Sequence, residues 1–263
     1  MSDLLSLGRR GESLSRFQVT DLHGHIGRHL FPIVDTGARS IVRIMDRIGV
    51  EALAISHLQC EAFRYREGNA EVLAAMRAHP GRVLGYVIVF PSSEAEVTRE
   101  MSGRVSEGFT GLKIEDVNGH SYLNPAYRGA LRIADERRMP VLLHTWGGAG
   151  GEFDEIRELA RSCRRVSFLL AHAGAASSEE AAIALARDIP NLYLDLALSA
   201  APRGIVERLT RGVGAERVTF GSDCCFISMT HQIGKVLGAK IPDSDKLLVL
   251  GGNARRILSL VER

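Results

Sequence analysis

Short apolar runs alternate with amphipathic segments along almost the whole chain. Eight runs are rich in β-branched and other apolar residues, at positions 17–22, 50–55, 83–90, 109–114, 140–143, 166–171, 192–196 and 218–221. Some are apolar almost throughout, as in LGYVIVF, which is typical of parallel strands covered on both faces. The segments between them have helical features. Residues 177–190, for example, begin with serines and carry two glutamates where a first helical turn favours them.

Eight strands alternating with helices predict an α/β fold with a parallel sheet. A doubly wound open sheet is the rival arrangement. The count of eight, and the polar residues that end several runs, favour a closed (β/α)8 TIM barrel. The chain has 263 residues, and about 250 is typical of one such barrel. No composition shift marks a domain boundary, so we expect a single domain over residues 1–263, with residues 1–16 as an N-terminal extension.

Composition and charge exclude several classes of partner. The formal net charge is +2, which gives no reason to expect nucleic acid or an anionic membrane. No stretch approaches the roughly 20 apolar residues of a membrane helix, and the first residues lack an apolar run of signal-peptide length. The four cysteines show neither zinc-finger nor disulfide-framework spacing. We therefore expect a cytoplasmic protein that acts on a small molecule.

The local pattern with the clearest chemistry is Asp21-Leu22-His23-Gly24-His25, at the end of the first run. Strand side chains alternate between faces, so His23 and His25 point the same way and suit one metal ion. An H-x-H pair alone is a weak motif, and its simplest alternative is two loop histidines.

Other strand ends strengthen the metal hypothesis. The fifth run closes with His144, the sixth with His172 and the eighth with Asp223. The carboxyl ends of barrel strands converge on one mouth, where active sites lie. Three or four nitrogen and oxygen ligands with one open position are what a catalytic zinc-type site requires.

These motifs together resemble the amidohydrolase superfamily, and within it the amidohydrolase-related branch that includes aminocarboxymuconate semialdehyde decarboxylase. DLHGHIG (residues 21–27) resembles the opening motif, and LKIEDVNGHSYLNP resembles the fourth-strand segment. LLHTWGG, LAHAG and FGSD resemble the fifth, sixth and eighth strand ends, and LGGNARRIL the C-terminal segment. The resemblance spans nearly the whole chain. It departs from the family after Asp223, where Cys224 and Cys225 stand in place of an aromatic residue and a proline.

The resemblance implies a role for each of these residues. The implied metal ligands are His23, His25, His144 and Asp223. Asp223 is also the implied proton acceptor for the attacking water, and His172 polarises the substrate or shuttles a proton. The implied cofactor is one divalent metal, zinc with manganese as the alternative. Such an ion lowers the pKa of bound water from about 16 to about 7.

Five further residues are expected near the site. Lys113 ends the fourth run. In some binuclear members of the superfamily a carboxylated lysine there bridges a second metal, but the related branch is usually mononuclear. We therefore favour Lys113 as a substrate contact, over a bridge or an ordinary solvent-facing lysine. Trp146 and Arg28 fall on loops after strands and suit an acidic or aromatic substrate, although surface arginines usually serve solubility alone. Asp21 and Asp195 are candidates to brace a ligand.

Three functions remain open at this point. The first is hydrolysis of a small lactone, amide or ester through a metal-activated water. The second is metal-dependent decarboxylation of a small aromatic or unsaturated carboxylic acid, which uses the same ligands. The third is a catalytically silent barrel that acts as a binding protein. Because relatives are often dimers, a homo-oligomer is open as well.

Overall fold

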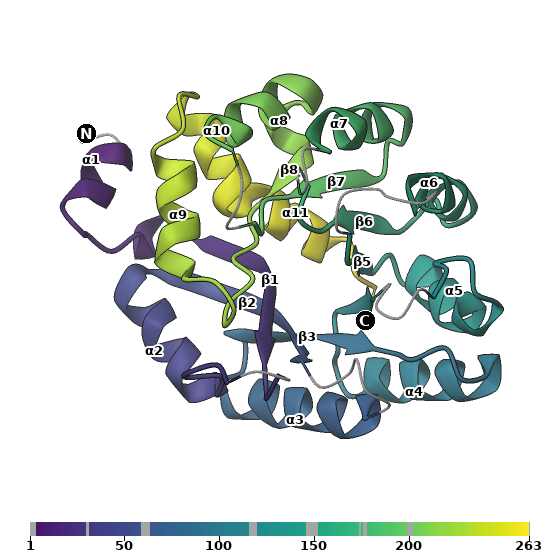
Figure 1. The fold of residues 1–263 in the computed structure, drawn as a ribbon. Coiled ribbons are helices and arrows are strands. Elements are labelled where there is room, and N and C mark those ends of the chain that lie inside the picture. Colours follow the sequence, from purple (N-terminus) through teal and green to yellow (C-terminus); the bar gives the residue numbers. More distant parts are fainter. Residues whose placement is uncertain are drawn as a thin grey trace.

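The structure, a computed structural model, describes residues 4–29, 32–58, 64–115, 120–145, 152–173, 175, 178–198 and 202–262. Eight parallel strands follow one another around a barrel in chain order, and most of the helices lie outside them (Figure 1). The strands are β1 (Val19–Ile26), β2 (Val50–His57), β3 (Val83–Ile88), β4 (Gly111–Ile114), β5 (Pro140–Leu143), β6 (Ser167–Leu170), β7 (Leu192–Asp195) and β8 (Val218–Thr219).

The helices of the described residues mostly follow the strands. They are α1 (Leu4–Arg9), α2 (Ala38–Ile48), α3 (Tyr65–Ala78), α4 (Glu94–Ser106), α5 (Arg128–Glu136), α6 (Glu152–Ser162), α7 (Glu179–Asp188), α8 (Ile205–Val213), α9 (Met229–Leu237), α10 (Asp243–Leu247) and α11 (Asn253–Ser259). Short 3-10 turns lie at Ser15–Phe17, Pro125–Tyr127 and Ala215–Arg217, and a π-helical turn at Leu248–Gly252 joins α10 to α11. The (β/α)8 barrel predicted from the apolar runs is confirmed.

Hydrogen bonds between β1 and the segment that directly follows β8 close the barrel, which rules out the open sheet. The backbone N–H of Leu22 donates to the carbonyl of Phe220 at 3.0 Å, and Gly24 forms a parallel bridge with Cys224. A Cβ atom at Gly24 would lie 2.7 Å from the side chain of Leu53 and 3.2 Å from Cys224 Sγ. The close approach of these strands therefore needs glycine at this position.

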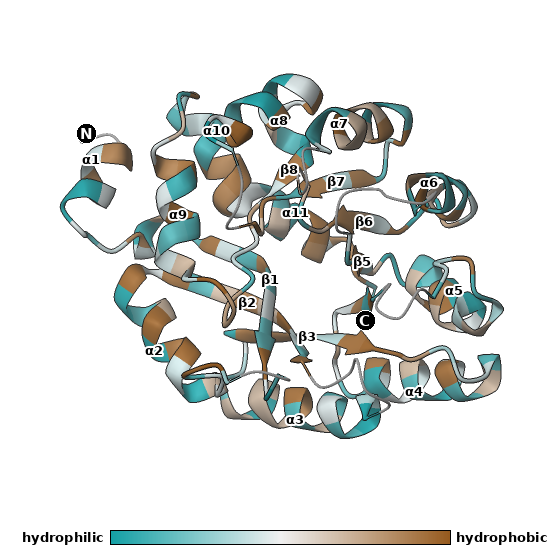
Figure 2. Cartoon of the chain, viewed as in Figure 1, coloured by the Kyte–Doolittle hydropathy of each residue, from teal (hydrophilic) through white to brown (hydrophobic). Residues whose placement is uncertain are grey.

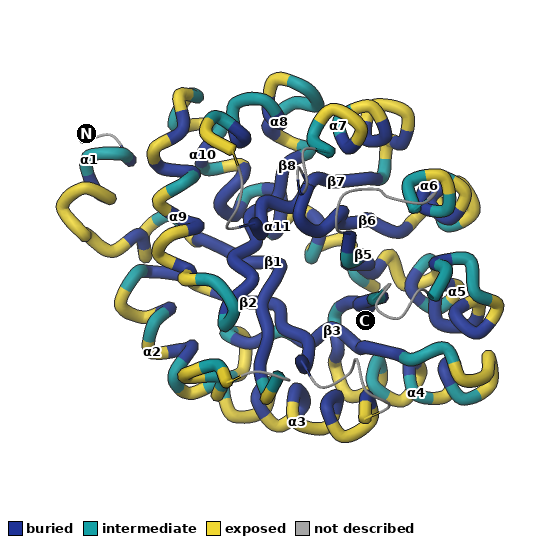
Figure 3. Tube along the Cα trace, viewed as in Figure 1, coloured by how far each residue is buried: buried dark blue, intermediate teal, exposed yellow. Residues whose placement is uncertain are grey.

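The strands are buried and most are apolar, while the helices present one face to the core and another to solvent (Figures 2 and 3). β4 to β7 are buried at every position, as continuous apolar runs predict. α2 shows the helical counterpart, because Ile41, Val42 and Met45 are its buried residues. Burial of these apolar faces stabilises the barrel by about 25 cal/mol per Å² of apolar surface.

The structure adds detail to two segments of the sequence-based prediction. β1 continues to Ile26 because it stays paired with β2 as far as His57, so the H-x-H motif lies inside the strand. The N-terminal extension contains α1, which buries Leu4 and Leu7 and lies near α9 (Figure 1). Within the described ranges, no helix is both long and apolar enough to cross a membrane.

Candidate metal centre

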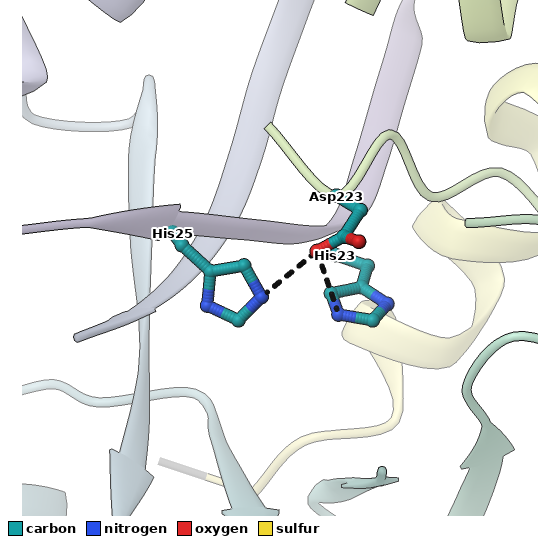
Figure 4. A group of neighbouring side chains, drawn as sticks. All are labelled: His23, His25 and Asp223. Atoms are coloured by element: carbon teal, nitrogen blue, oxygen red, sulfur yellow. Dashed lines mark ion pairs between the residues drawn. The ribbon is translucent and has the colours of Figure 1, made fainter. Parts of the chain in front are cut away.

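Three of the four predicted ligands meet at the mouth of the barrel. His23 and His25 come from β1, and Asp223 follows β8 (Figure 4). One potential ligand atom from each side chain lies within 4.8 Å of those of the others. Oδ1 of Asp223 is 3.1 Å from Nε2 of His25 and 3.7 Å from Nε2 of His23. Both imidazoles thus face the same carboxylate oxygen.

A left-handed backbone turn brings Asp223 over β1. Its φ is 57°, a conformation that aspartate adopts more readily than most residues. Its N–H donates to the carbonyl of His23 at 2.7 Å, which fixes the turn against the strand. His172 has a φ of 56°, so two predicted site residues share this uncommon conformation. Such conformations persist where surrounding contacts enforce them, and they cluster at functional sites.

The ring nitrogens that point away from this meeting point have partners. Nδ1 of His23 lies 3.0 Å from Oδ1 of Asp195, and Nδ1 of His25 lies 3.1 Å from the hydroxyl of Ser56. When Asp195 is ionised it only accepts, so His23 carries its proton on Nδ1 and presents a lone pair at Nε2. Nε2 of His23 is buried and has no hydrogen-bond partner among the described residues. A divalent metal with nitrogen and oxygen ligands fits this donor set.

The charge balance of the site also suits a cation. Burial raises the pKa of Asp195 to about 8 and the pKa of Asp21 to about 7. Burial likewise lowers the pKa of His23 well below its usual value, with Lys113 the next contributor. A nearby cation favours ionised carboxylates and neutral imidazoles, which are the forms that bind metal.

The two bracing candidates, Asp21 and Asp195, act on different groups. Oδ1 of Asp21 accepts hydrogen bonds from the backbone N–H groups of His23 and Ser222, each at 3.0 Å. Asp21 therefore ties β1 to the segment after β8. Asp195 instead contacts the His23 ring, so it orients the imidazole itself.

His172 lies between His23 and His144. Its ring centroid is 5.0 Å from that of His23 and 5.2 Å from that of His144. Nδ1 of His172 donates to the carbonyl of Ala197, since a carbonyl only accepts. Burial lowers the pKa of His172 to about 4, so the ring is neutral near pH 7 and its Nε2 is an acceptor. His144 is half-buried and lies outside the group of three, and its role as a ligand stays a prediction.

Lys113 has a neighbour that sequence reasoning missed. Lys113 is fully buried, and its Nζ lies 3.3 Å from Oε1 of Glu115. The other oxygen of Glu115 lies 3.9 Å from Nδ1 of His144. Burial alone would raise the pKa of Glu115, but Lys113 and His144 outweigh it and lower the pKa to about 2. The available signal was its position directly after β4, two residues from Lys113 and hence on the same face.

Of the two remaining predicted substrate contacts, Arg28 and Trp146, the structure describes only Arg28. Arg28 is exposed and lines a cavity of about 890 Å³ with residues of α2 and α3, among them Arg39 and Glu71. None of His23, His25 and Asp223 lines that cavity. Trp146 lies outside the described residues.

Comparison with known proteins supports the likeness seen in the motifs. A family model described as amidohydrolase matches residues 21–260. No curated protein matched the chain in sequence.

Several solved structures share the fold. 2,6-Dihydroxybenzoate decarboxylase from Rhizobium is 17% identical with a TM-score of 0.71, and the match covers 92% of this chain and 98% of that one. 5-Carboxyvanillate decarboxylase from Sphingomonas paucimobilis is 15% identical with a TM-score of 0.69, covering 92% and 99%. A probable 2-pyrone-4,6-dicarboxylic acid hydrolase from Acinetobacter baumannii is 12% identical with a TM-score of 0.67, also covering 92% and 99%.

Proposed function

The chain belongs to the amidohydrolase family, whose model it matches over residues 21–260, and on that premise we propose that it is a metal-dependent hydrolase of a small carbonyl compound such as a lactone, an amide or an ester. The observation that carries the proposal is the convergence of His23, His25 and Asp223 within 4.8 Å. His144 is the proposed fourth ligand. A divalent ion bound there would act as a Lewis acid, which lowers the pKa of water and polarises a carbonyl oxygen.

Asp223 has the geometry of a proton acceptor at this centre. Oδ1 faces both Nε2 atoms, at 3.1 Å from His25 and 3.7 Å from His23. The carboxylate retains its second oxygen for a proton taken from the attacking water. General base catalysis of this kind increases the reaction rate about 10²–10⁴-fold.

His172 is suited to move a proton at Nε2. Because its Nδ1–H is used by the carbonyl of Ala197, the neutral ring offers Nε2 as an acceptor. The arrangement therefore supports the shuttle role over polarisation of a substrate oxygen, which needs a donor at Nε2. His172 would accept at Nε2 the proton that Asp223 had taken from the water, and would then donate it to the leaving group.

The ion pair between Lys113 and Glu115 bears on both the metal count and the substrate. A lysine that bridges two metal ions is carboxylated at its side-chain nitrogen, whereas Nζ of Lys113 lies 3.3 Å from Oε1 of Glu115 in an ion pair. This supports one metal ion per chain. The carboxylate of Glu115 also offsets the positive charge of Lys113, which would otherwise attract a substrate carboxylate. The pairing therefore supports a substrate whose reacting group is uncharged.

Decarboxylation of a small aromatic or unsaturated acid is the second candidate. Its support is that two of the three similar structures described above carry the names of decarboxylases. Both reactions use the same proposed ligands, so product analysis separates them.

The first test is the metal content of protein purified without added metal. Wild type, His25→Ala and Asp223→Ala are compared with His231→Ala, whose side chain is exposed on α9. About one zinc or manganese ion per chain, lost only in the two site variants, would support the site. Two ions would make Lys113 a bridge, and none after soaking would refute metal-dependent chemistry.

The metal-loaded protein is then offered lactones, esters, amides and aromatic acids. Hydrolysis without release of carbon dioxide supports the first candidate, and carbon dioxide release from an acid supports the second. A loaded protein that turns over none of them favours the silent binding barrel.

A further inference from the structure

The segment that leaves β7 connects two side chains of the candidate metal centre. Residues Leu196, Ala197 and Leu198 are buried and lie outside the strand ladder. The N–H of Ala197 donates to Oδ1 of Asp195 at 3.1 Å, the same oxygen that contacts His23. The carbonyl of Ala197 accepts from Nδ1 of His172. The backbone position of Ala197 therefore affects the orientation of both imidazole rings.

A lysine from α9 holds this segment on both sides of Ala197. Nζ of Lys235 donates to the carbonyl of Leu196 at 2.9 Å and to the carbonyl of Leu198 at 2.7 Å. Both carbonyls belong to buried residues, where an acceptor without a donor is unfavourable. α9 begins six residues after Asp223, so Lys235 links the segment that carries Asp223 to the segment that orients His23 and His172.

The chemistry of Lys235 argues against a purely space-filling role. The side chain is half-buried, and burial lowers its pKa to about 8, while the charge of Asp195 opposes that shift. An apolar residue would avoid the desolvation of an ammonium group but would leave both carbonyls without this donor. The two hydrogen bonds of the ammonium group hold the backbone on both sides of Ala197.

We propose that Lys235 is a positioning residue of the metal centre, which holds Ala197 so that Asp195 and His172 keep their orientations. The positioning role rests on the proposed function, because it matters only if His23 and His172 serve a metal-dependent reaction. Lys235 acts through the backbone carbonyls of Leu196 and Leu198.

Nuclear magnetic resonance of protein labelled with 15N-histidine tests the proposal without any substrate. Spectra of Lys235→Met, Lys235→Arg and the control Lys240→Met are recorded for protein as purified and after zinc is added. Lys240 is exposed three residues beyond α9. The signal of His172 is assigned by its loss in His172→Asn. In wild type we expect a single tautomer with a slowly exchanging Nδ1 proton.

In Lys235→Met we expect mixed tautomers of His172 and exchange of the Nδ1 proton faster by about tenfold. Lys235→Arg, which keeps a cationic donor, should restore the wild-type signal at least in part, and Lys240→Met should leave it unchanged. A lower melting temperature in Lys235→Met with an unaltered His172 signal would overturn the positioning role. Absence of metal from wild type would count against the proposed function instead, since the His172 signal is measured independently of metal content.

Discussion

Nδ1 of His23 lies 3.0 Å from Oδ1 of Asp195, and both side chains are fully shielded from solvent. The contact joins residues 172 positions apart in the chain. It fixes the ring of His23 so that Nε2 faces Asp223. Carboxylate partners of this kind keep a metal-binding imidazole in one tautomer and raise its basicity.

Replacement of that carboxylate should weaken metal binding without removing a ligand. Asp195→Asn retains the shape of the side chain but loses its charge, so we expect zinc affinity to fall about 10–100-fold. Competition with a chromophoric chelator measures the affinity. Glu71→Gln is the matched control. Its carboxylate lies 3.0 Å from Nε2 of His57, and neither residue belongs to the group of three ligands. Equal affinity in wild type and Asp195→Asn would show that Asp195 does not support a ligand.

Gly221 provides a steric test of the same contact. A Cβ atom at this position would lie 2.0 Å from Oδ2 of Asp195 and 2.7 Å from Cβ of His23. Gly221→Ala should therefore displace both side chains, cost about 1–3 kcal/mol of stability and lower the zinc content. Gly103→Ala on α4 is the control, because a Cβ there meets nothing within 4 Å. Full zinc occupancy in Gly221→Ala would contradict the assigned geometry.

Metal should stabilise the folded protein measurably. Zinc at about 100 times its dissociation constant adds roughly 2.7 kcal/mol to the free energy of unfolding. For a domain of this size, that corresponds to a rise in melting temperature of roughly 5–10 °C. Scanning fluorimetry of wild type and Asp223→Ala, each with zinc or magnesium, measures the shift. We expect the rise only for wild type with zinc, since magnesium prefers an octahedral set of oxygens. A similar rise in Asp223→Ala would place the ion elsewhere.

Glu115 should make stability depend on pH in the acid range. Its pKa is lowered from 4.5 to about 2 in the folded protein, where Lys113 and His144 outweigh the effect of burial. A lowered folded pKa contributes stability above pH 4.5, and that contribution is lost as the pH falls from 4.5 toward 2.

Glu115→Gln should therefore lower the free energy of unfolding by about 3 kcal/mol near pH 7, as expected when a buried ion pair is broken. Below pH 4.5 the stability of this variant should fall less steeply with pH than that of wild type. Urea unfolding between pH 3 and about 7 measures both effects. Glu67→Gln is the control, since Glu67 pairs with Arg64 at 3.8 Å on the surface, where an ion pair contributes about 0–1 kcal/mol. Parallel pH curves for wild type and Glu115→Gln would refute the pairing.

Several features of the molecule follow from the sequence because they depend on local periodicity. Eight apolar runs of strand length, separated by amphipathic helices, predict the barrel. The two-residue period of a strand predicts that His23 and His25 share a face. Polar residues at the carboxyl ends of parallel strands predict that Asp223 joins them, and the structure brings these three together.

The tertiary structure decided which side chains contact one another, because the periodicity of the sequence does not encode those contacts. The partner of each ring depends on which strands are neighbours and on their relative register, so the contact of His23 with Asp195 has no local pattern. The contact of Glu115 with His144, and the position of Arg28 in a cavity beside α2 and α3, likewise depend on side-chain direction in the folded chain. Sequence alone determined which strand ends carry chemistry. The packing of elements distant in the chain determined which of those side chains meet, because contact, burial and charge arise only when the barrel closes.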